Sequence, residues 1–241
     1  MNIIDGEFAN FYVDENKEKM EITYARTLPN LHWNPLYVPF EIEVEKITDK
    51  YEVAYINGVH SYDNDDNGEI DELTMEVIKV KSGTTKANYP YLIKACNEEA
   101  KTMNISMEDA ILYASYENTV DCSSVYQSFE ITGSYSRKSA EELNGKLAIS
   151  LEGAWQPLAD ETYLNPFRLY LNISNRDDSP LKVNPAALSR VKIVENGETT
   201  GIIDLTPVTS EKEVIYDLAG RRVMKPQKGQ FYIVNGKKVI Y

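Results

Sequence analysis

The chain has 241 residues and a net charge of −13, with 38 acidic residues against 25 Lys and Arg. Such a surface repels phosphate groups, so the charge excludes nucleic acid and anionic membrane surfaces as partners. No window of the sequence approaches the roughly 20 apolar residues of a membrane-spanning helix, and we expect no membrane insertion. The length suffices for one large β domain or two smaller ones with a buried core.

Short runs of β-branched and aromatic residues follow one another along the first 195 positions. Tyr is abundant at 17 residues, and no stretch longer than about ten residues keeps a helical apolar period. Residues 41–45 alternate strictly between glutamate and an aliphatic residue, which is typical of a strand with one buried face. The expected body strands are residues 8–13, 20–26, 33–40, 41–45, 51–55, 75–80, 91–93, 126–135, 146–150, 154–158, 167–173 and 191–194.

Three stretches are expected to interrupt this pattern or to lie at its edge. Pro35 and Pro39 restrict residues 33–40 to a sheet edge or an extended crossing strand, because proline donates no hydrogen bond to a ladder. Residues 101–116 alternate loosely, and one helical turn is expected to begin at residues 106–109. Residues 139–144 form the best candidate for a helix.

The strand spacing of about 8 to 12 residues is typical of a β-sandwich. We therefore predict an all-β fold with a jelly-roll-like β-sandwich over residues 1–195, either as one domain or as two halves. Residues 196–213, with glycine, proline and alternating Thr and Glu, are predicted to be a linker. Residues 214–241 are predicted to form a small C-terminal β-unit.

Residues 63–71 (DNDDNGEID) carry the one pattern that suggests a ligand. Oxygen-bearing side chains stand at positions 1, 3, 5 and 9, with Gly at position 6 and an apolar residue at position 8, as in an EF-hand-type calcium loop. The twelfth position is Thr74 instead of a bidentate Glu, and the flanks are strands, so the loop is not an EF-hand. We expect a weak calcium site in which Asp63, Asp65, Asn67 and Asp71 contribute side-chain oxygens and Glu69 contributes its backbone carbonyl. The alternative is a plain acidic hairpin loop with an Asn67-Gly68 turn.

The other candidate sites point away from catalysis. His32 and His60 stand in no motif with Ser, Cys or Asp, and no P-loop, dinucleotide fingerprint, nucleophile elbow or zinc pattern is present. Trp33 and Trp155 fit core or edge positions better than a sugar-stacking platform. We therefore predict no enzymatic activity, with a carbohydrate-binding module or a fragment of a glycan-acting enzyme as the alternative.

The two cysteines, Cys96 and Cys122, form neither a disulfide framework nor a metal-ligand pattern. In an oxidising compartment they would be able to form a single bridge. The alternative is two unpaired thiols, since nothing in the sequence brings the two positions together.

The C-terminal residues 214–241 differ from the rest of the chain in charge. The tail has six Lys and Arg and a single acidic residue, Asp217, so its net charge is +5. Because the whole chain has a net charge of −13, the preceding 213 residues have a net charge of −18. Its expected strands are residues 214–216, 222–224, 231–234 and 237–241, with a tight reversal at Asn235-Gly236.

This tail closely resembles the C-terminal segment of many secreted and surface proteins of gut and oral Bacteroidales. The matching residues are IYDL at 215–218, GRRV at 220–223 and YIVNGKKV at 232–239. The tail is also similar to a shortened type IX secretion sorting domain, but it lacks the final basic residue of that domain. A sorting signal and a terminal β-unit that only packs on the preceding domain therefore stay as alternatives.

Three blocks of the body, residues 31–42, 87–94 and 165–171, are similar to β-rich domains found upstream of this tail in large Bacteroidales surface proteins. The resemblance implies an extracellular or cell-surface location and no assigned activity. The first six residues are not a signal peptide, so we expect an export signal that is removed or lies upstream. We predict a non-catalytic accessory or display domain that binds an extracellular ligand, or a host or glycan surface, with calcium as its only cofactor.

Overall fold

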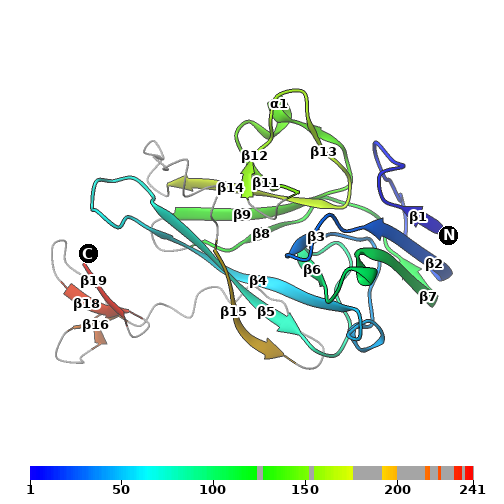
Figure 1. Ribbon diagram of the computed structural model, residues 1–241, viewed down its shortest axis with the longest axis horizontal. Helices are drawn as coiled ribbons and strands as arrows, with labels where there is room; N and C mark the ends of the chain where they lie inside the picture. The colour runs from blue at the N-terminus through cyan, green and yellow to red at the C-terminus, as the bar shows by residue number, and fades with distance from the viewer. Residues whose placement is uncertain are drawn as a thin grey trace. The chain divides into compact units, whose positions relative to one another are not determined.

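The computed structural model describes residues 1–123, 127–151 and 155–175 in full, together with the backbone of five strands further along the chain (Figure 1). The chain divides into two compact units, Met1–Ile203 and Asp204–Tyr241. Nearly all regular elements are β-strands arranged in several sheets, which confirms the prediction of an all-β sandwich with a small C-terminal β-unit. The last strand of the first unit, β15 (Lys192–Thr199), runs past position 195, where the sandwich was expected to end, into the first residues of the expected linker.

One large sheet of the first unit is built around a long antiparallel hairpin, with the strand order β15-β5-β4-β6-β3. Its other strands are β3 (Asn34–Leu36), β4 (Tyr51–Tyr62), β5 (Glu72–Val80) and β6 (Tyr91–Ala95). Pro35 lies on β3 at the edge of this sheet, as predicted, where no further strand requires its missing N–H. β15 joins the opposite edge in parallel with β5.

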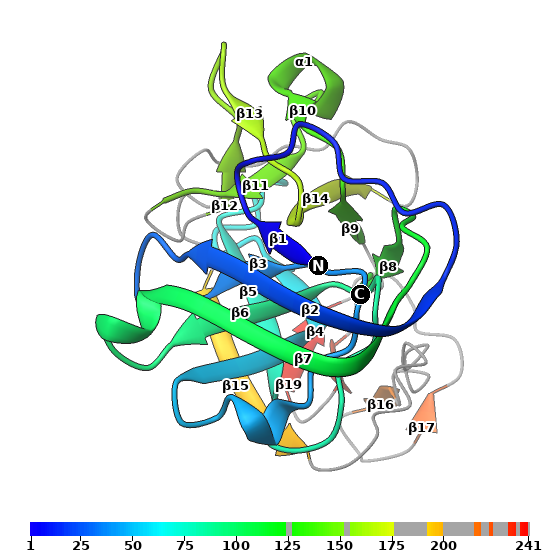
Figure 2. The same ribbon diagram turned by 90° about the vertical axis from the view of Figure 1, so that its right-hand side faces the viewer.

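A second five-stranded sheet lies across the first as another layer and has the order β12-β11-β14-β9-β8, all antiparallel (Figures 1 and 2). Its strands are β8 (Thr119–Asp121), β9 (Gln127–Ser134), β11 (Leu147–Ile149), β12 (Trp155–Pro157) and β14 (Arg168–Asn175). Phe129 and Ile131 of β9 are fully buried, and Val53 and Ala54 of β4 are at most 1% exposed. The sandwich core therefore contains side chains from both sheets.

A third sheet has three strands in the order β1-β2-β7, so β7 lies at its edge. These strands are β1 (Asn2–Ile4), β2 (Lys17–Thr27) and β7 (Thr102–Leu112). The helical turn expected at residues 106–109 is wrong, because these residues continue β7 opposite β2. The strand expected at residues 8–13 is reduced to a single bridge between Asn10 and Ser136.

The remaining elements are short. The described residues include one α-helix, α1 (Ala140–Leu143), where the sequence predicted it; Ser139 and Glu142 form a capping box at its start. Two 3₁₀ turns are η1 (Val44–Lys46) and η2 (Glu99–Lys101), and β10 (Lys138–Ser139) pairs with β13 (Tyr163–Leu164). Residues 41–45 keep their predicted alternation of burial, but they form one bridge followed by η1 instead of a ladder strand.

The C-terminal unit contains a four-stranded antiparallel sheet in the order β17-β16-β18-β19. Its strands are β16 (Ile215–Asp217), β17 (Arg222–Val223), β18 (Phe231–Val234) and β19 (Lys237–Ile240). These four strands coincide within one or two residues with those predicted from the sequence. The predicted reversal at Asn235-Gly236 falls outside the described residues.

Six aromatic rings form a cluster in the core of the first unit. They are Phe11, Tyr24, Tyr37, Phe40, Tyr135 and Phe167. Phe167 lies 5.1 Å from Phe11, 5.7 Å from Tyr24 and 5.8 Å from Tyr135 between ring centroids. Such tilted and edge-on pairs add about 0.5–1.5 kcal/mol each beyond the burial of their area. The cluster joins β2, the ends of β9 and β14, and the segment after β3.

Gly133 of β9 is required by this cluster. A β-carbon at this position would lie 2.1 Å from ring carbons of Tyr37, which is far below any normal contact. The Tyr37 ring cannot withdraw easily, because its hydroxyl donates to the Tyr116 carbonyl at 2.6 Å and accepts from the Asn118 N–H at 2.9 Å. The sheet and the aromatic ring therefore approach each other at a place where only glycine fits.

Two buried charged side chains, Asp5 and Arg26, and the half-buried Arg168 lie next to the aromatic cluster. The Asp5 carboxylate accepts hydrogen bonds from both terminal nitrogens of Arg168, at 3.1 and 2.6 Å, and lies 3.2 Å from Nε of Arg26. Arg26 also donates to the carbonyl of Pro35. The side chains of Arg26 and Asp5 are 2% and 5% exposed. Burial, together with nearby Arg168, lowers the pKa of Arg26 to about 10 although Tyr24 and Asp5 act to raise it, so Arg26 is still charged at neutral pH.

We expect Asp5→Asn to lower the free energy of unfolding by about 3–5 kcal/mol, the usual cost of leaving a buried charge without its partner. Two arginines would then face each other without a carboxylate. Urea denaturation followed by circular dichroism measures the change. Glu7→Gln, an exposed substitution two residues further on, is the control and should be nearly neutral. Equal effects of the two variants would contradict the role of Asp5.

We expect Gly133→Ala to lower the free energy of unfolding by about 1–3 kcal/mol, since the added methyl group displaces Tyr37 or the β9 backbone. Gly58→Ala on β4 is the matched control, because a β-carbon there would meet its nearest atom, His60 Nε2, at an ordinary 3.6 Å. Thermal unfolding of both variants gives the comparison. If Gly58→Ala lowered the stability as much as Gly133→Ala, the loss would come from replacing any strand glycine, and the close approach of Tyr37 would not be its cause.

Candidate functional site

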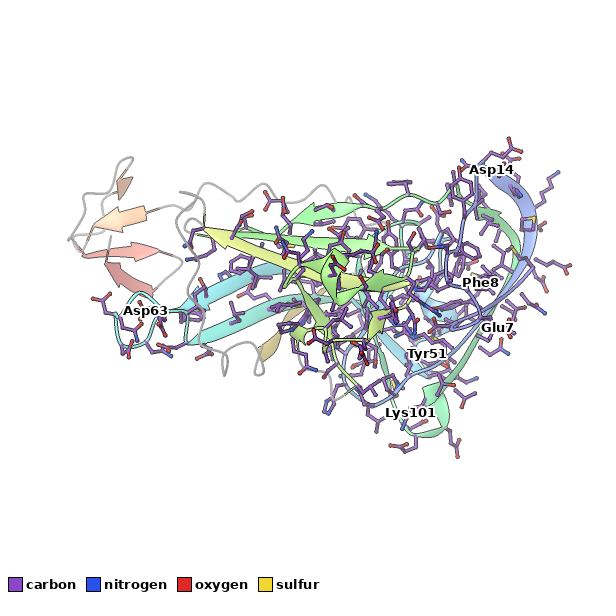
Figure 3. The ribbon with its side chains drawn as sticks, turned by 90° about the horizontal axis from the view of Figure 1, so that it is seen from above. Glu7, Phe8, Asp14, Tyr51, Asp63 and Lys101 are labelled. Carbon is purple, nitrogen blue, oxygen red and sulfur yellow. The ribbon has the colours of Figure 1, made fainter. Side chains whose placement is uncertain are left out.

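The predicted calcium loop, residues 63–71, joins β4 to β5 at the end of the long hairpin, with Asp63 at the start of the loop (Figure 3). Its backbone takes positive φ at Asp66 and at Gly68, at 60° and 84°. This bend is what Gly at position 6 of the pattern predicted, because glycine adopts positive φ without strain. The N–H of Asp71 closes the loop onto the carbonyl of Tyr62 at 2.8 Å.

Backbone N–H groups hold the carboxylate of Asp63 inside the loop. Its two oxygens accept from Asn67 at 3.1 Å and from Gly68 at 2.7 Å. Burial acts to raise the pKa of Asp63, but the hydrogen bonds from the backbone of Gly68, Asn67 and their neighbours outweigh it and lower the pKa. Asp63 is therefore ionised and oriented at neutral pH.

The loop brings three of the five predicted ligand residues together. Asp63, Asp65 and Asp71 each offer one carboxylate oxygen, and these oxygens lie within 4.8 Å of one another. Asp63 and Asp65 are exposed and Asp71 is half-buried. Three carboxylates this close repel one another, and a divalent cation between them would remove that repulsion.

The other two predicted residues are placed differently. The side-chain oxygen of Asn67 accepts from the N–H of Glu69 at 2.7 Å, and its amide nitrogen donates to Asp65 at 3.0 Å. Asn67 therefore shapes the loop and orients Asp65. Glu69 was expected to contribute its backbone carbonyl, and its N–H holds Asn67 in place. Thr74, in the twelfth position, lies on β5 and is only 8% exposed.

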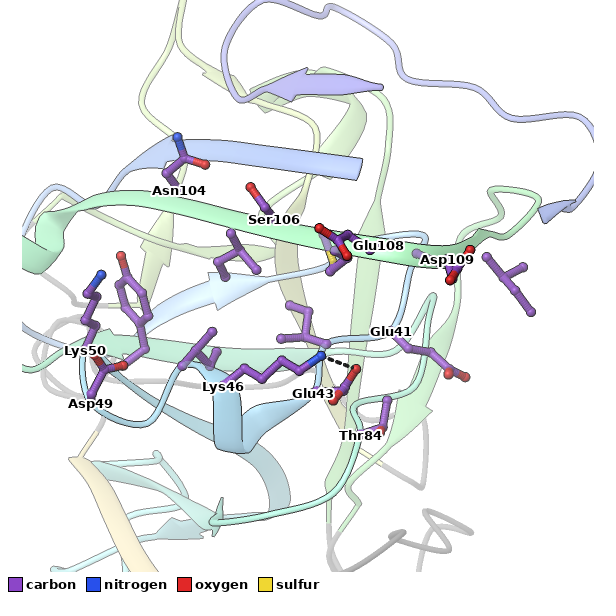
Figure 4. A pocket seen from close by; sticks show the side chains of 17 residues that line it. Glu41, Glu43, Lys46, Asp49, Lys50, Thr84, Asn104, Ser106, Glu108 and Asp109 are labelled. Carbon is purple, nitrogen blue, oxygen red and sulfur yellow. Dashed lines mark hydrogen bonds and ion pairs between the residues drawn. The ribbon is translucent and has the colours of Figure 1, made fainter. Parts of the chain in front are cut away.

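A second site, which the sequence did not indicate, is a groove of about 460 Å³ between β7 and residues 41–51 (Figure 4). Residues 104–111 of β7 form one wall, and the segment that contains η1 forms the other. Its base contains the buried side chains of Ile42, Ile47 and Tyr51. The loose alternation of residues 101–116 was the one signal in the sequence, and it does not tell which strand lies at an edge.

The rim of the groove is acidic. Its charged residues are Glu41, Glu43, Asp49, Glu108 and Asp109 against Lys46 and Lys50. Lys46 is paired with Glu43 at 2.8 Å. The rim therefore attracts positively charged ligands and repels negatively charged ones.

The tryptophans and histidines lie where the sequence placed them. Trp155 is fully buried, and Trp33 is 5% exposed with the ammonium of Lys94 4.8 Å from its ring centroid. Neither ring is available as a sugar platform. His32 is exposed, and His60 is 3.4 Å from Glu76 with its side chain 40% exposed.

Comparisons with protein-family models, with curated proteins and with solved structures find no match for this chain. Within the described part of the chain, no helix has both the length and the apolar composition needed to cross a membrane.

Both cysteines are unpaired thiols in the structure. Of the two alternatives left open by the sequence, a single disulfide bridge or two unpaired thiols, the structure therefore has the unpaired thiols. Cys96 is exposed and Cys122 is 8% exposed. Burial, with a smaller contribution from the charge of Asp121, raises the pKa of Cys122 to about 12. Since the thiolate is the reactive form, Cys122 should be inert in the folded protein.

We expect a thiol reagent such as Ellman's reagent to modify Cys96 rapidly at pH 8 in the folded protein and Cys122 only after unfolding. The Cys96→Ser variant should then show almost no rapid reaction. Cys122→Ser, as the control, should retain it. Rapid modification of Cys122 in the folded Cys96→Ser variant would contradict its burial.

Proposed function

We propose that this chain is a non-catalytic accessory or display domain of an exported Bacteroidales surface protein, and that its β4–β5 loop binds calcium. The observation that carries the calcium proposal is the convergence of Asp63, Asp65 and Asp71 within 4.8 Å. The proposed location outside the cell is supported by the resemblance of residues 214–241 to the C-terminal segment of such proteins.

Calcium fits the loop better than magnesium does. Calcium accepts six to eight oxygen ligands in irregular geometry, whereas magnesium requires a nearly ideal octahedron. Three carboxylates on one short loop, completed by carbonyl oxygens and water, suit the first of these cations. Without a bidentate glutamate at Thr74 the affinity should be low, with a dissociation constant of about 10⁻⁴ to 10⁻³ M, as in extracellular modules.

The groove favours a binding role over glycan hydrolysis. Tyr51 is the one aromatic residue among its described lining residues, and this side chain is 3% exposed at the base. Sugar rings are commonly held by exposed aromatic faces, which this groove does not offer. A carbohydrate-binding module or a glycan-acting enzyme fragment is therefore the weaker candidate.

We expect isothermal titration with calcium to show one weak site in the full chain and none in the double variant Asp63→Ala with Asp65→Ala. The two substitutions remove two of the three converging carboxylates and the acceptor for the Gly68 N–H. Magnesium at the same concentration should give much less heat. Calcium should also raise the thermal midpoint of the parent protein, because a ligand that binds only the folded state stabilises it.

The control is Glu18→Ala with Glu21→Ala, which removes the same charge from two exposed positions of β2. This variant should bind calcium like the parent. No heat from the parent at millimolar calcium, or equal heat from the Asp63 and Asp65 variant, would leave only a plain acidic hairpin loop.

A further inference from the structure

The groove beside β7 follows the free edge of a sheet. Eight consecutive residues, 104–111, line it. Because successive side chains of a strand point to opposite faces, a groove lined by consecutive residues runs along the edge of the strand and not over one face. Within the described residues β7 pairs with β2 alone, so its other edge lacks a neighbouring strand.

Backbone groups of β7 point into this groove. The N–H of Leu28, next to β2, donates to the carbonyl of Lys101 at 2.8 Å, so Lys101 directs its backbone groups toward the β2 side and Asn104, three residues on in a regular register, directs its own toward the groove. In an antiparallel ladder every second residue directs its N–H and C=O away from the partner strand. The register from Asn104 to Ser106 is regular, so Ser106 presents its N–H and C=O to the groove as well.

The opposite wall is fixed in place before any ligand arrives. The N–H of Val44 donates to the carbonyl of Gly83 at 2.9 Å, and the N–H of Thr85 donates to the carbonyl of Ile42 at 3.0 Å. The carboxylate of Glu45 accepts from the N–H of Gly83 at 2.8 Å. A preformed wall reduces the ordering that binding would require.

We propose that this groove binds an extended peptide of a partner protein, added as a strand to the edge of β7, in which apolar residues alternate with Lys or Arg. The backbone groups at Ser106 would pair with the peptide, and its alternate side chains would point to the base and to the rim. The apolar base formed by Ile42 and Ile47 suits the apolar side chains of the peptide. The rim, with five carboxylates and two ammonium groups, suits its Lys or Arg side chains.

The irregular end of β7 limits the site to a short peptide. The register shifts where Met20 and Ile22 of β2 face Ala110 and Met107, which leaves one extra residue on β7. Asp109 takes a positive φ of 50° at this bulge. A bulge disrupts further pairing along an edge, which protects the strand from uncontrolled aggregation. The proposal rests on the proposed display function only in naming its class of ligand, and it does not involve the calcium loop.

The test uses the full chain and a fluorescein-labelled peptide of eight alternating Lys and Val residues, followed by fluorescence anisotropy. Two control peptides have the same length: one replaces Lys by Glu, and the other keeps every Lys but carries N-methyl groups on alternate backbone nitrogens. We expect the Glu peptide not to bind and the N-methylated peptide to bind at least tenfold more weakly, since it keeps the charge and loses backbone donors. Equal binding of the parent and N-methylated peptides would overturn the proposal and show only attraction between charges.

Two protein variants locate the site. Ser106→Pro removes the outward N–H at an edge position where proline is tolerated, and Glu108→Gln with Asp109→Asn removes two rim charges. Each should weaken the Lys-Val peptide at least tenfold, whereas Glu18→Gln with Glu21→Gln should not. Unchanged affinity in both site variants would overturn the proposal. If Ser106→Pro does not fold, the N-methylated peptide on the unmodified protein decides the question.

Sedimentation of the free protein addresses the other occupant of such an edge. We expect a monomer at the concentrations of the peptide assay. The protein would instead form a dimer if a second copy of the chain filled the groove. A dimer that is lost in Ser106→Pro, and that persists when the Lys-Val peptide is added, would overturn the proposal of a partner peptide. Calcium titration of the same samples separates this result from the proposed calcium site, because Asp63→Ala with Asp65→Ala should leave peptide binding unchanged.

Discussion

The geometry of the first unit depends on a carboxylate shared between two arginines. Asp5, just after β1, contacts Arg26 of β2 and Arg168 of β14, so one buried charge joins the three-stranded sheet to the second large sheet. Burying the charges of Asp5 and Arg26 is costly, and the cost is offset because the carboxylate accepts two hydrogen bonds from Arg168 and forms an ion pair with Arg26. Its contribution is to fix the position of β2, which a purely apolar contact would allow to slide.

The edge of β7 is a consequence of that fixed position. β2 is held on one side by Arg26 and Tyr24, and β7 pairs along the length of β2. The aromatic cluster then fixes Tyr37 and Phe40, which lead into residues 41–51, the other wall of the groove. Both walls are thus attached to the same core. Core packing therefore contributes to the width of the groove.

The sequence predicted the elements better than it predicted their neighbours. Alternation and turn residues indicated β4, β5, β14 and the tail strands, because these depend on local pattern. The strand at residues 41–45 was wrong in part, since its alternation reflects burial against the core and not pairing in a ladder. The helical turn at residues 106–109 was wrong because a polar run at a bulge has no clear period. Which strands lie at an edge depends on contacts between residues far apart in the chain, and local pattern does not contain them.

The same limit applies to the sites. The calcium pattern of residues 63–71 is local, so the sequence identified its carboxylates and its glycine bend, and the structure brings Asp63, Asp65 and Asp71 together. It left Asn67 either as a ligand or as part of an Asn67-Gly68 turn, because spacing does not tell whether an oxygen faces inward, and in the structure Asn67 shapes the loop. The groove joins residues about sixty positions apart and left almost no local signal.

The acidic charge of the chain is used in two different geometries. In the loop, backbone N–H groups turn three carboxylates toward one point, which matches a small divalent ion. Along the groove, five acidic residues are spread over two walls, which matches positive charges repeated along an extended chain. A single divalent cation would offset most of the charge of the first arrangement and a smaller part of the second. The difference between a converging and a distributed set of carboxylates is therefore what separates the proposed metal site from the proposed peptide site.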